Sequence, residues 1–179
     1  MTRNRDIIIF VDAHVFDGEY QGTQTYLREM YLKILDFRRD IIVYFGAADI
    51  ACINSIFGHF NNARFIQYNS KRPFNRLFIE IPRIIDHLQC TYAHFQYVIP
   101  FKKYQYCTYI VTIHDILFND FPNEFSFLYR LQRNITFKLS AKRCDILLTV
   151  SNYSKNKISK RYNIDINTIL YLLEILFLE

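Results

Sequence analysis

The sequence predicts an α/β fold in which helices cover both faces of a doubly wound, mostly parallel sheet. Short apolar runs of strand length alternate with longer segments whose apolar residues recur at helical spacing. The connections between them are short, as is typical of strand–helix–strand units. The 179 residues are 51% hydrophobic and 22% charged. This length fits one domain with a sizeable core, and this composition excludes a disordered chain.

The first half of the chain begins with the apolar strand Ile7–Asp12, which is hydrophobic on both faces like a central parallel strand. A helix follows over residues 23–37, and Thr23 or Thr25 is expected to cap it. The remaining elements predicted for this half are a strand at Ile41–Phe45, a short helix at 49–60 and a strand at Arg64–Tyr68.

The next segment is the clearest amphipathic helix, Pro73–Leu88, which Pro82 is expected to bend. Its apolar stripe is predicted to comprise Phe74, Leu77, Phe78, Ile81, Ile84, Ile85 and Leu88. The other predicted elements are strands at Thr91–Phe95, Cys107–Ile113 and Asp145–Val150, a helix at 124–142, and a helix at Ser151–Tyr162 capped by Ser151.

The charge and the cysteines restrict the partners. A net charge of +5 and a pI of about 9.0 favour an anionic partner. The basic residues are scattered and form no nucleic-acid-binding motif, so we expect no nucleic acid partner. The four cysteines, at positions 52, 90, 107 and 144, are too widely spaced for a metal site and indicate reduced thiols.

The sequence also predicts where the chain is located. No run approaches about 20 apolar residues, so no transmembrane helix is expected. The apolar run that follows the basic N-terminal residues is too short for a signal peptide, because Asp12 ends it. These features predict a cytoplasmic protein.

Candidate functional residues follow the strands, since ligands of such sheets bind beyond the carboxyl ends of the strands. His114 and Asp115 come directly after a buried strand, and His94 ends the strand before it. An imidazole beside a carboxylate can exchange a proton near neutral pH, although the same pair could simply cap the loop through backbone hydrogen bonds. The remaining histidines, at positions 14, 59 and 87, have no comparable surroundings.

Gly22 precedes a predicted helix, where a free backbone N–H could approach a phosphate. The alternative is an ordinary turn glycine. The pattern G-x-G-x-x-G is absent, so nicotinamide or flavin binding is not supported. Ser151 and Ser154 lie at another strand-to-helix turn without G-x-S-x-G, which favours helix capping over a hydrolase nucleophile.

Four blocks, taken in order, resemble the N-terminal domain of GT-B glycosyltransferases of family 4. They are GEYQGTQTYLREM, YAHFQYVIP, VTIHDILFNDFPNEFS and AKRCDILLTVSNYSKNKISKRYNI. The resemblance covers about residues 6–166. It is most specific in VTIHD and in D-x-x-x-T-V-S-x-x-S.

The resemblance implies a Rossmann-like, acceptor-side half of a two-domain enzyme. Such an enzyme transfers a sugar from a nucleotide-sugar to a glycan or lipid-linked acceptor, retains the anomeric configuration and requires no metal. Carried onto this chain, Gly22 would approach the donor diphosphate. His114 would line the active centre, and Asp115 and His94 would contribute to the acceptor site.

The chain departs from the family pattern in two places. Gln21 stands where the family usually has the first of two glycines. Residues 1–166 form the expected domain, and 167–179 form an apolar tail in which Glu174 and Glu179 do not make the family's E-x7-E motif. We therefore expect a truncated gene product that is inactive without a separate donor-binding chain. The alternative is a non-enzymatic α/β binding module.

A weak contact with anionic membrane is also expected, at the inner face of the membrane. Lys71, Arg72, Arg76 and Arg83 surround the amphipathic helix, and Lys102 and Lys103 lie in a nearby loop. Each cation near an anionic bilayer contributes about 1 kcal/mol. The alternative is that the apolar stripe packs on the sheet and leaves an ordinary solvated basic face.

Overall fold

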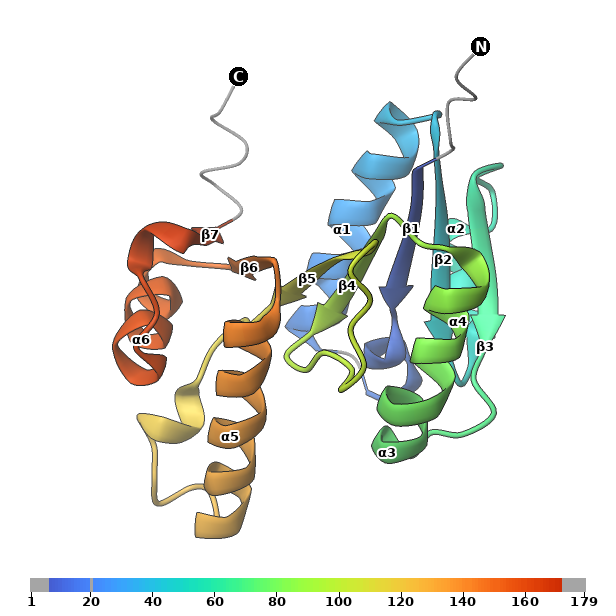
Figure 1. The fold of residues 1–179 in the computed structure, drawn as a ribbon. Coiled ribbons are helices and arrows are strands. Elements are labelled where there is room, and N and C mark those ends of the chain that lie inside the picture. The colour runs from blue at the N-terminus through green and yellow to red at the C-terminus, as the bar shows by residue number, and fades with distance from the viewer. Residues whose placement is uncertain (1–6, 20, 172–179) are drawn as a thin grey trace. The chain divides into compact units, whose positions relative to one another are not determined.

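The fold is an α/β sheet of seven strands, seen in a computed structural model that describes residues 7–19 and 21–171 (Figure 1). The strand order is β3-β2-β1-β4-β5-β6-β7. The pairs β1–β2, β1–β4, β2–β3, β5–β6 and β6–β7 are all parallel. This order confirms the predicted doubly wound fold. The strands are β1 (Ile7–Asp12), β2 (Ile41–Ala47), β3 (Ala63–Gln67), β4 (Tyr92–Gln96), β5 (Thr108–Thr112), β6 (Ile146–Thr149) and β7 (Ile169–Tyr171).

The chain forms two compact units. Unit 1 comprises residues 1–95 and 100–108, and unit 2 comprises residues 96–99 and 109–179. The helices of unit 1 are α1 (Gly22–Phe37), α2 (Ile50–Phe57), α3 (Pro73–Asn75) and α4 (Ile81–Leu88). Those of unit 2 are α5 (Phe127–Arg143) and α6 (Asn152–Tyr162). None of the helices in the described part of the chain is both long and apolar enough to cross a membrane.

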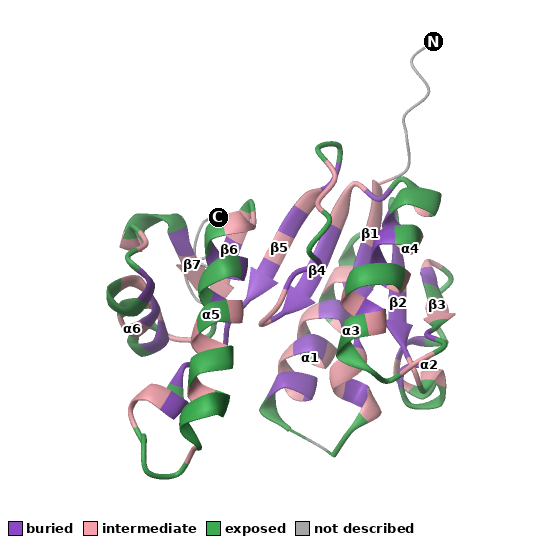
Figure 2. Ribbon diagram, turned by 60° about the horizontal axis from the view of Figure 1, so that its bottom comes forward, coloured by how far each residue is buried: buried purple, intermediate pink, exposed green. Residues whose placement is uncertain are grey.

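The core of unit 1 lies between its strands and the helices α1 and α2. Strand residues such as Val11, Val43 and Phe45 pack there against Leu27 and Tyr31 of α1. The central strands are accordingly the most buried part of this unit (Figure 2). Because side chains alternate along a strand, the neighbours of Val11 on β1, Phe10 and Asp12, point to the opposite face.

The segment 73–88 is helical throughout but irregular, and this corrects the predicted stripe. Residues Arg76–Glu80 form a π-helical turn in which the Ile81 N–H donates to the Arg76 carbonyl. In a regular α-helix Leu77 would lie one turn before the buried Ile81, whereas the wider turn brings Arg76 there instead. The irregularity directly precedes Pro82, which has no N–H to donate.

As a result the two ends of the predicted stripe differ in burial. Ile81 and Ile85 are buried, as expected, but Phe74 and Phe78 are exposed on the surface of unit 1. Arg76, which was predicted to lie on the basic outer face, is buried. The prediction was wrong at this end because it assumed 3.6 residues per turn throughout the helix.

Helix starts follow the expected chemistry at α2, α5 and α6. The side chains of Asp49, Ser126 and Ser151 accept hydrogen bonds from backbone N–H groups at the starts of α2, α5 and α6. The cap predicted at Ser151 is therefore confirmed. The cap predicted for the first helix is wrong, because α1 begins at Gly22 after Gln21, which makes no side-chain cap, and Thr23 is buried.

The last described residues of unit 2 form a strand that the sequence did not indicate. Residues 167–179 were expected to form an apolar tail, but Ile169–Tyr171 pair in parallel with β6. Ile169 is fully buried in this position. The remainder of the predicted tail, residues 172–179, lies outside the described residues.

Candidate functional site

The strand order places the expected ligand crevice at the carboxyl ends of β1 and β4. From β1 the chain proceeds to β2 on one side, and from β4 it proceeds to β5 on the other side. Ligands of doubly wound sheets bind outside the strands at such a reversal. Val11 of β1 pairs with His94 of β4. Asp12 is the next residue and the last one of β1, so it lies where the crevice is expected to begin.

A cluster of four polar side chains in unit 1 lies at this end of β1. Its centre is Asp12, whose carboxylate is completely buried. The Oδ1 atom accepts a hydrogen bond of 2.9 Å from the Tyr68 hydroxyl. The Oδ2 atom lies 3.1 Å from Nδ1 of His14 and 3.5 Å from Nε of Arg76. We call these four residues the Asp12 cluster.

The cluster keeps its central carboxylate ionised. Burial by itself would raise the pKa of Asp12, but the charges of His14 and Arg76, together with hydrogen bonds from His14 and Tyr68, lower it to about 2. Burial and the adjacent carboxylate raise the pKa of the Tyr68 hydroxyl well above its ordinary value, so that group stays protonated and donates. A buried charge with three polar partners beside a predicted ligand crevice is a typical feature of functional sites.

The sequence reasoning missed this cluster. His14 was expected to have no surroundings comparable to those of His114, yet it lies beside a buried carboxylate. One local signal was available: His14 follows Asp12 by only two residues at the end of a strand, so the two side chains are close in the chain. No sequence pattern indicated Tyr68 or Arg76.

His94 lies on the other face of the sheet from the Asp12 cluster. Its side chain is buried, and its Nδ1 shares a 2.9 Å hydrogen bond with the hydroxyl of Tyr31, a core residue of α1. The two rings also lie against one another, with centroids 5.8 Å apart. The structure thus gives His94 a place in the packing between β4 and α1.

Gly22 is the first residue of α1 and is exposed. A Cβ atom built on it would have no heavy atom within 4 Å, and its φ angle is not positive. The fold therefore does not require glycine at this position. The loop before it is held by the side chain of Gln24, whose Nε2 donates to the carbonyls of Val15, Gly18 and Glu19.

His114 lies in unit 2, two residues after the last residue of β5, and is buried. Its Nε2 is 2.8 Å from Oε1 of Gln96, and its ring lies against that of Tyr97, with centroids 5.4 Å apart. Burial lowers the pKa of His114 to about 4, so the ring is neutral at pH 7. A neutral imidazole can donate through one nitrogen and accept through the other.

Asp115 points its carboxylate back at its own loop. Its Oδ1 accepts a hydrogen bond of 3.1 Å from the backbone N–H of Leu117, which starts a short 3-10 turn. This is the capping role that the sequence left open for the pair. His114 and Asp115 are neighbours in the chain but have different partners, since His114 contacts Gln96 and Tyr97.

Two further features concern ligands. Within residues 7–19 and 21–171 there is no group of three or more His, Cys, Asp or Glu side chains arranged to hold a metal ion.

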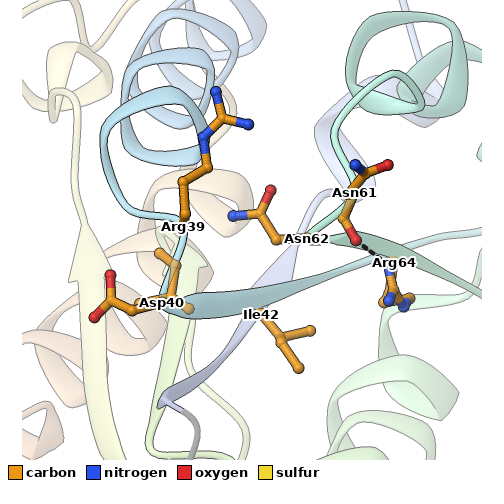
Figure 3. A pocket seen from close by; sticks show the side chains of 7 residues that line it. Arg39, Asp40, Ile42, Asn61, Asn62 and Arg64 are labelled. Atoms are coloured by element: carbon orange, nitrogen blue, oxygen red, sulfur yellow. Dashed lines mark hydrogen bonds between the residues drawn. The ribbon is translucent and has the colours of Figure 1, made fainter.

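An open pocket in unit 1 is lined by polar residues that include Arg39, Asp40, Asn62 and Arg64 (Figure 3). These residues lie at the amino ends of β2 and β3, the edge opposite to the predicted crevice.

Comparison with known proteins shows similarity only at the level of the structure. No protein-family model matches the chain, and no curated protein matches it. The wall teichoic acid polymerase TagF is similar over 92% of this chain and 38% of its own, with 17% identity and a TM-score of 0.54. A variant of TagF gives the same identity and TM-score over 92% of this chain and 37% of its own. A glycosyltransferase from Rickettsia africae ESF-5 has 19% identity and a TM-score of 0.49 over 94% of this chain and 42% of its own.

The similarities to the TagF chains show a shared fold. The chain spans less than two fifths of the TagF chains that it matches, so it corresponds to one part of a larger protein in that comparison. The Rossmann-like α/β architecture predicted from the sequence is thereby confirmed.

Proposed function

We propose that this chain is the acceptor-side domain of a glycosyltransferase with the two-domain GT-B architecture. The observation that carries the proposal is that nearly the whole chain shares its fold with one part of a polymerase of wall teichoic acid. The strand order predicts a ligand crevice at the carboxyl ends of β1 and β4, which supports the proposal. The family 4 sequence resemblance supports the same assignment.

In this proposal the chain takes part in transferring a sugar from a nucleotide-sugar to a glycan or lipid-linked acceptor, with retention and without a metal. Gly22 approaches the donor diphosphate, and its exposed position at the start of α1 suits that role. His114 lines the active centre as a neutral hydrogen-bonding ring, and Asp115 and His94 belong to the acceptor side. A donor-binding half completes the enzyme.

The test is transfer of a radiolabelled sugar from UDP-glucose or GDP-mannose to a polyprenyl-linked or glycan acceptor. The chain is assayed alone and with the donor-binding domain of a family 4 enzyme added in trans. We expect transfer only in the mixture, and its loss when His114→Ala replaces the wild-type chain. Transfer by the chain alone would contradict the need for a second half. Acceptor binding without transfer in any mixture would favour a non-enzymatic binding module.

We also propose that unit 1 contacts anionic membrane, because its surface carries an unexpected aromatic patch. Phe74, Phe78 and Phe101 are 64%, 48% and 69% exposed, respectively. Their rings are stacked in sequence, with centroids 4.7 Å apart for Phe74–Phe78 and 6.0 Å apart for Phe78–Phe101. The exposed cations of the same segments are Lys71, Arg72, Arg83 and Lys102. Aromatic rings among cations fit the interface of an anionic bilayer.

Co-sedimentation with vesicles tests the membrane contact. We expect binding to phosphatidylglycerol vesicles but not to phosphatidylcholine vesicles, and we expect salt to weaken it. Substituting Phe74 and Phe78 by Ser should abolish binding. The matched control is Phe37→Ser, at an 80% exposed ring at the end of α1. Equal recovery in the supernatant with both vesicle types at low salt, or equal loss from the Phe37 variant, would contradict the proposal.

A further inference from the structure

Helix α5 of unit 2 is apolar on two opposite sides. Its inner side is marked by Phe137, Ser140 and Ala141, which are buried. Its outer side carries a second set of large apolar side chains, each between 44% and 74% exposed, and Figure 2 shows exposed residues along the length of α5. We call this set the α5 stripe, and its members are Phe127, Leu128, Leu131, Ile135 and Leu139. A helix that is apolar on both sides is typical of one that packs against a second partner.

The spacing of the α5 stripe favours another helix as that partner. Leu128, Leu131 and Ile135 are separated by three and four residues, the repeat with which paired helices interlock side by side. Leu139 continues the row one turn later, and the whole stripe extends over about 18 Å of the helix. A row of this spacing fits between the side chains of a second helix.

The α5 stripe is also complementary to itself when two copies of α5 run antiparallel. About a two-fold axis at position 133, Phe127 faces Leu139 of the partner subunit, and Leu131 faces Ile135 of the partner subunit. Each of these contacts occurs twice, because in a two-fold symmetric pair every contact has a symmetric counterpart. Four of the five members of the stripe thereby meet an apolar side chain.

The charges at the ends of the stripe favour the antiparallel direction. Helix α5 contains five cations and no carboxylate side chain, and the two cations that border the stripe, Lys138 and Lys142, are exposed. In an antiparallel pair Lys142, in the last turn, approaches the start of the partner helix, just before which the exposed carboxylate of Glu124 lies. A parallel pair would instead bring both lysines close to their own copies, where like charges repel.

We propose that the α5 stripe is a self-association surface, through which two copies of this chain form an antiparallel, two-fold symmetric helix pair. Removal of apolar area from water stabilises the pair, and the opposite charges at its two ends fix its direction. An anionic bilayer is a poorer fit, because Glu124 at the end of the stripe would repel it. The contact lies in unit 2 and is separate from the aromatic patch of unit 1. It goes beyond the proposed function and does not depend on it.

The oligomeric state of the full chain is tested by sedimentation velocity over a range of protein concentrations. We expect a monomer–dimer equilibrium. Replacing Leu131 and Ile135 together by Ser should raise the dimer Kd by about 30-fold or more, as loss of central apolar contacts does. The matched control is the joint replacement of Phe74 and Phe78 by Ser, which removes two exposed rings from unit 1 and should leave the dimer Kd unchanged. Circular dichroism confirms that both variants keep their helices.

A chain that is monomeric at every concentration would overturn the proposal. So would a dimer whose Kd rises equally in both double variants, or one that the Leu131 and Ile135 substitutions leave unchanged. Phosphatidylglycerol vesicles distinguish self-association from a lipid contact. A monomeric chain whose vesicle binding depends on Leu131 and Ile135 would assign the stripe to a bilayer and overturn the proposal as well.

Exchange of charges tests the antiparallel direction. Lys142→Glu and Glu124→Lys should each raise the dimer Kd by roughly threefold to tenfold, because like charges then meet at both ends of the pair. The variant with both substitutions restores opposite charges and should recover most of the wild-type Kd. Lys160→Glu, at an exposed position of α6, is the control for net charge and should have no effect. Additive weakening in the double variant would overturn the antiparallel pairing. These measurements are independent of sugar transfer, so a failed transfer assay would leave them unaffected.

Discussion

At the residue scale, the buried charge of Asp12 dominates the energetics of the candidate site. We expect Asp12→Asn to destabilise the fold by about 3 kcal/mol, because removing one partner of a buried ion pair leaves Arg76 uncompensated. The control is Asp40→Asn, which breaks an exposed pair with Arg38 at an oxygen–nitrogen distance of 2.8 Å and should leave the urea midpoint unchanged. Equal effects of the two substitutions in urea unfolding would show that burial of Asp12 has no energetic consequence.

A second residue-scale prediction concerns Gly46, which lies on β2 beside the cluster. A Cβ atom there would lie 2.7 Å from Cζ of the Tyr68 ring, so the ring and its hydrogen bond to Asp12 would have to move. We expect Gly46→Ala to lower the free energy of unfolding by about 1–3 kcal/mol, as is typical when a side chain is forced into a packed core. Gly22→Ala, in open space, should cost nothing measurable. Thermal unfolding of both variants distinguishes them, and a stable Gly46→Ala protein would contradict the packing described here.

At the element scale, the helix caps provide a graded prediction. Ser126 caps α5 by accepting a hydrogen bond from the Tyr129 N–H, so Ser126→Ala should cost about 1 kcal/mol. Gln21 occupies the same position at α1 without a side-chain bond, so Gln21→Ala should have no comparable effect. The check is urea unfolding followed by circular dichroism. A loss of stability at Gln21 as large as that at Ser126 would be inconsistent with the cap geometry.

At the scale of the whole molecule, acid should destabilise the fold in two successive ranges of pH. The folded pKa of His114 is about 4, below its ordinary value of 6.5, so the unfolded chain binds the extra proton first. The neutral His114 ring stabilises the folded chain fully above about pH 6.5. This contribution to the free energy of unfolding decreases as the pH falls toward 4, and about 2 kcal/mol of it is lost by about pH 5. Asp12 follows: its stabilisation is complete above about pH 4 and is lost as the pH falls toward 2.

Urea midpoints measured between neutral and acidic pH test this order. His114→Gln should flatten the profile above about pH 4, because the glutamine does not titrate. It should leave the more acidic loss in place, since that loss belongs to Asp12 in the other unit. If the wild-type and His114→Gln profiles run parallel from neutral pH to about pH 4, the buried state of His114 is not coupled to stability.

The sequence by itself determined the order and type of most elements. Apolar runs of strand length and the helical spacing between them are local patterns, and they predicted six strands and the doubly wound class. The Ser151 cap was predictable for the same reason, because a cap and its N–H lie within one turn. The strand Ile169–Tyr171 was not recognised because it has only three residues. In the sequence these residues are followed by further apolar residues, so no local signal marks the end of the strand.

The tertiary structure decided the candidate site. Asp12 and Tyr68 are 56 residues apart, and only the folded sheet brings them together. Arg76 reaches Asp12 because one helical turn is wider than periodicity predicts, and the same turn leaves Phe74 and Phe78 exposed. A periodic pattern reports which side of an element is apolar, but it does not report which distant polar groups will share a buried charge. That depends on the alignment of strands and helices, which is fixed only when the whole core packs.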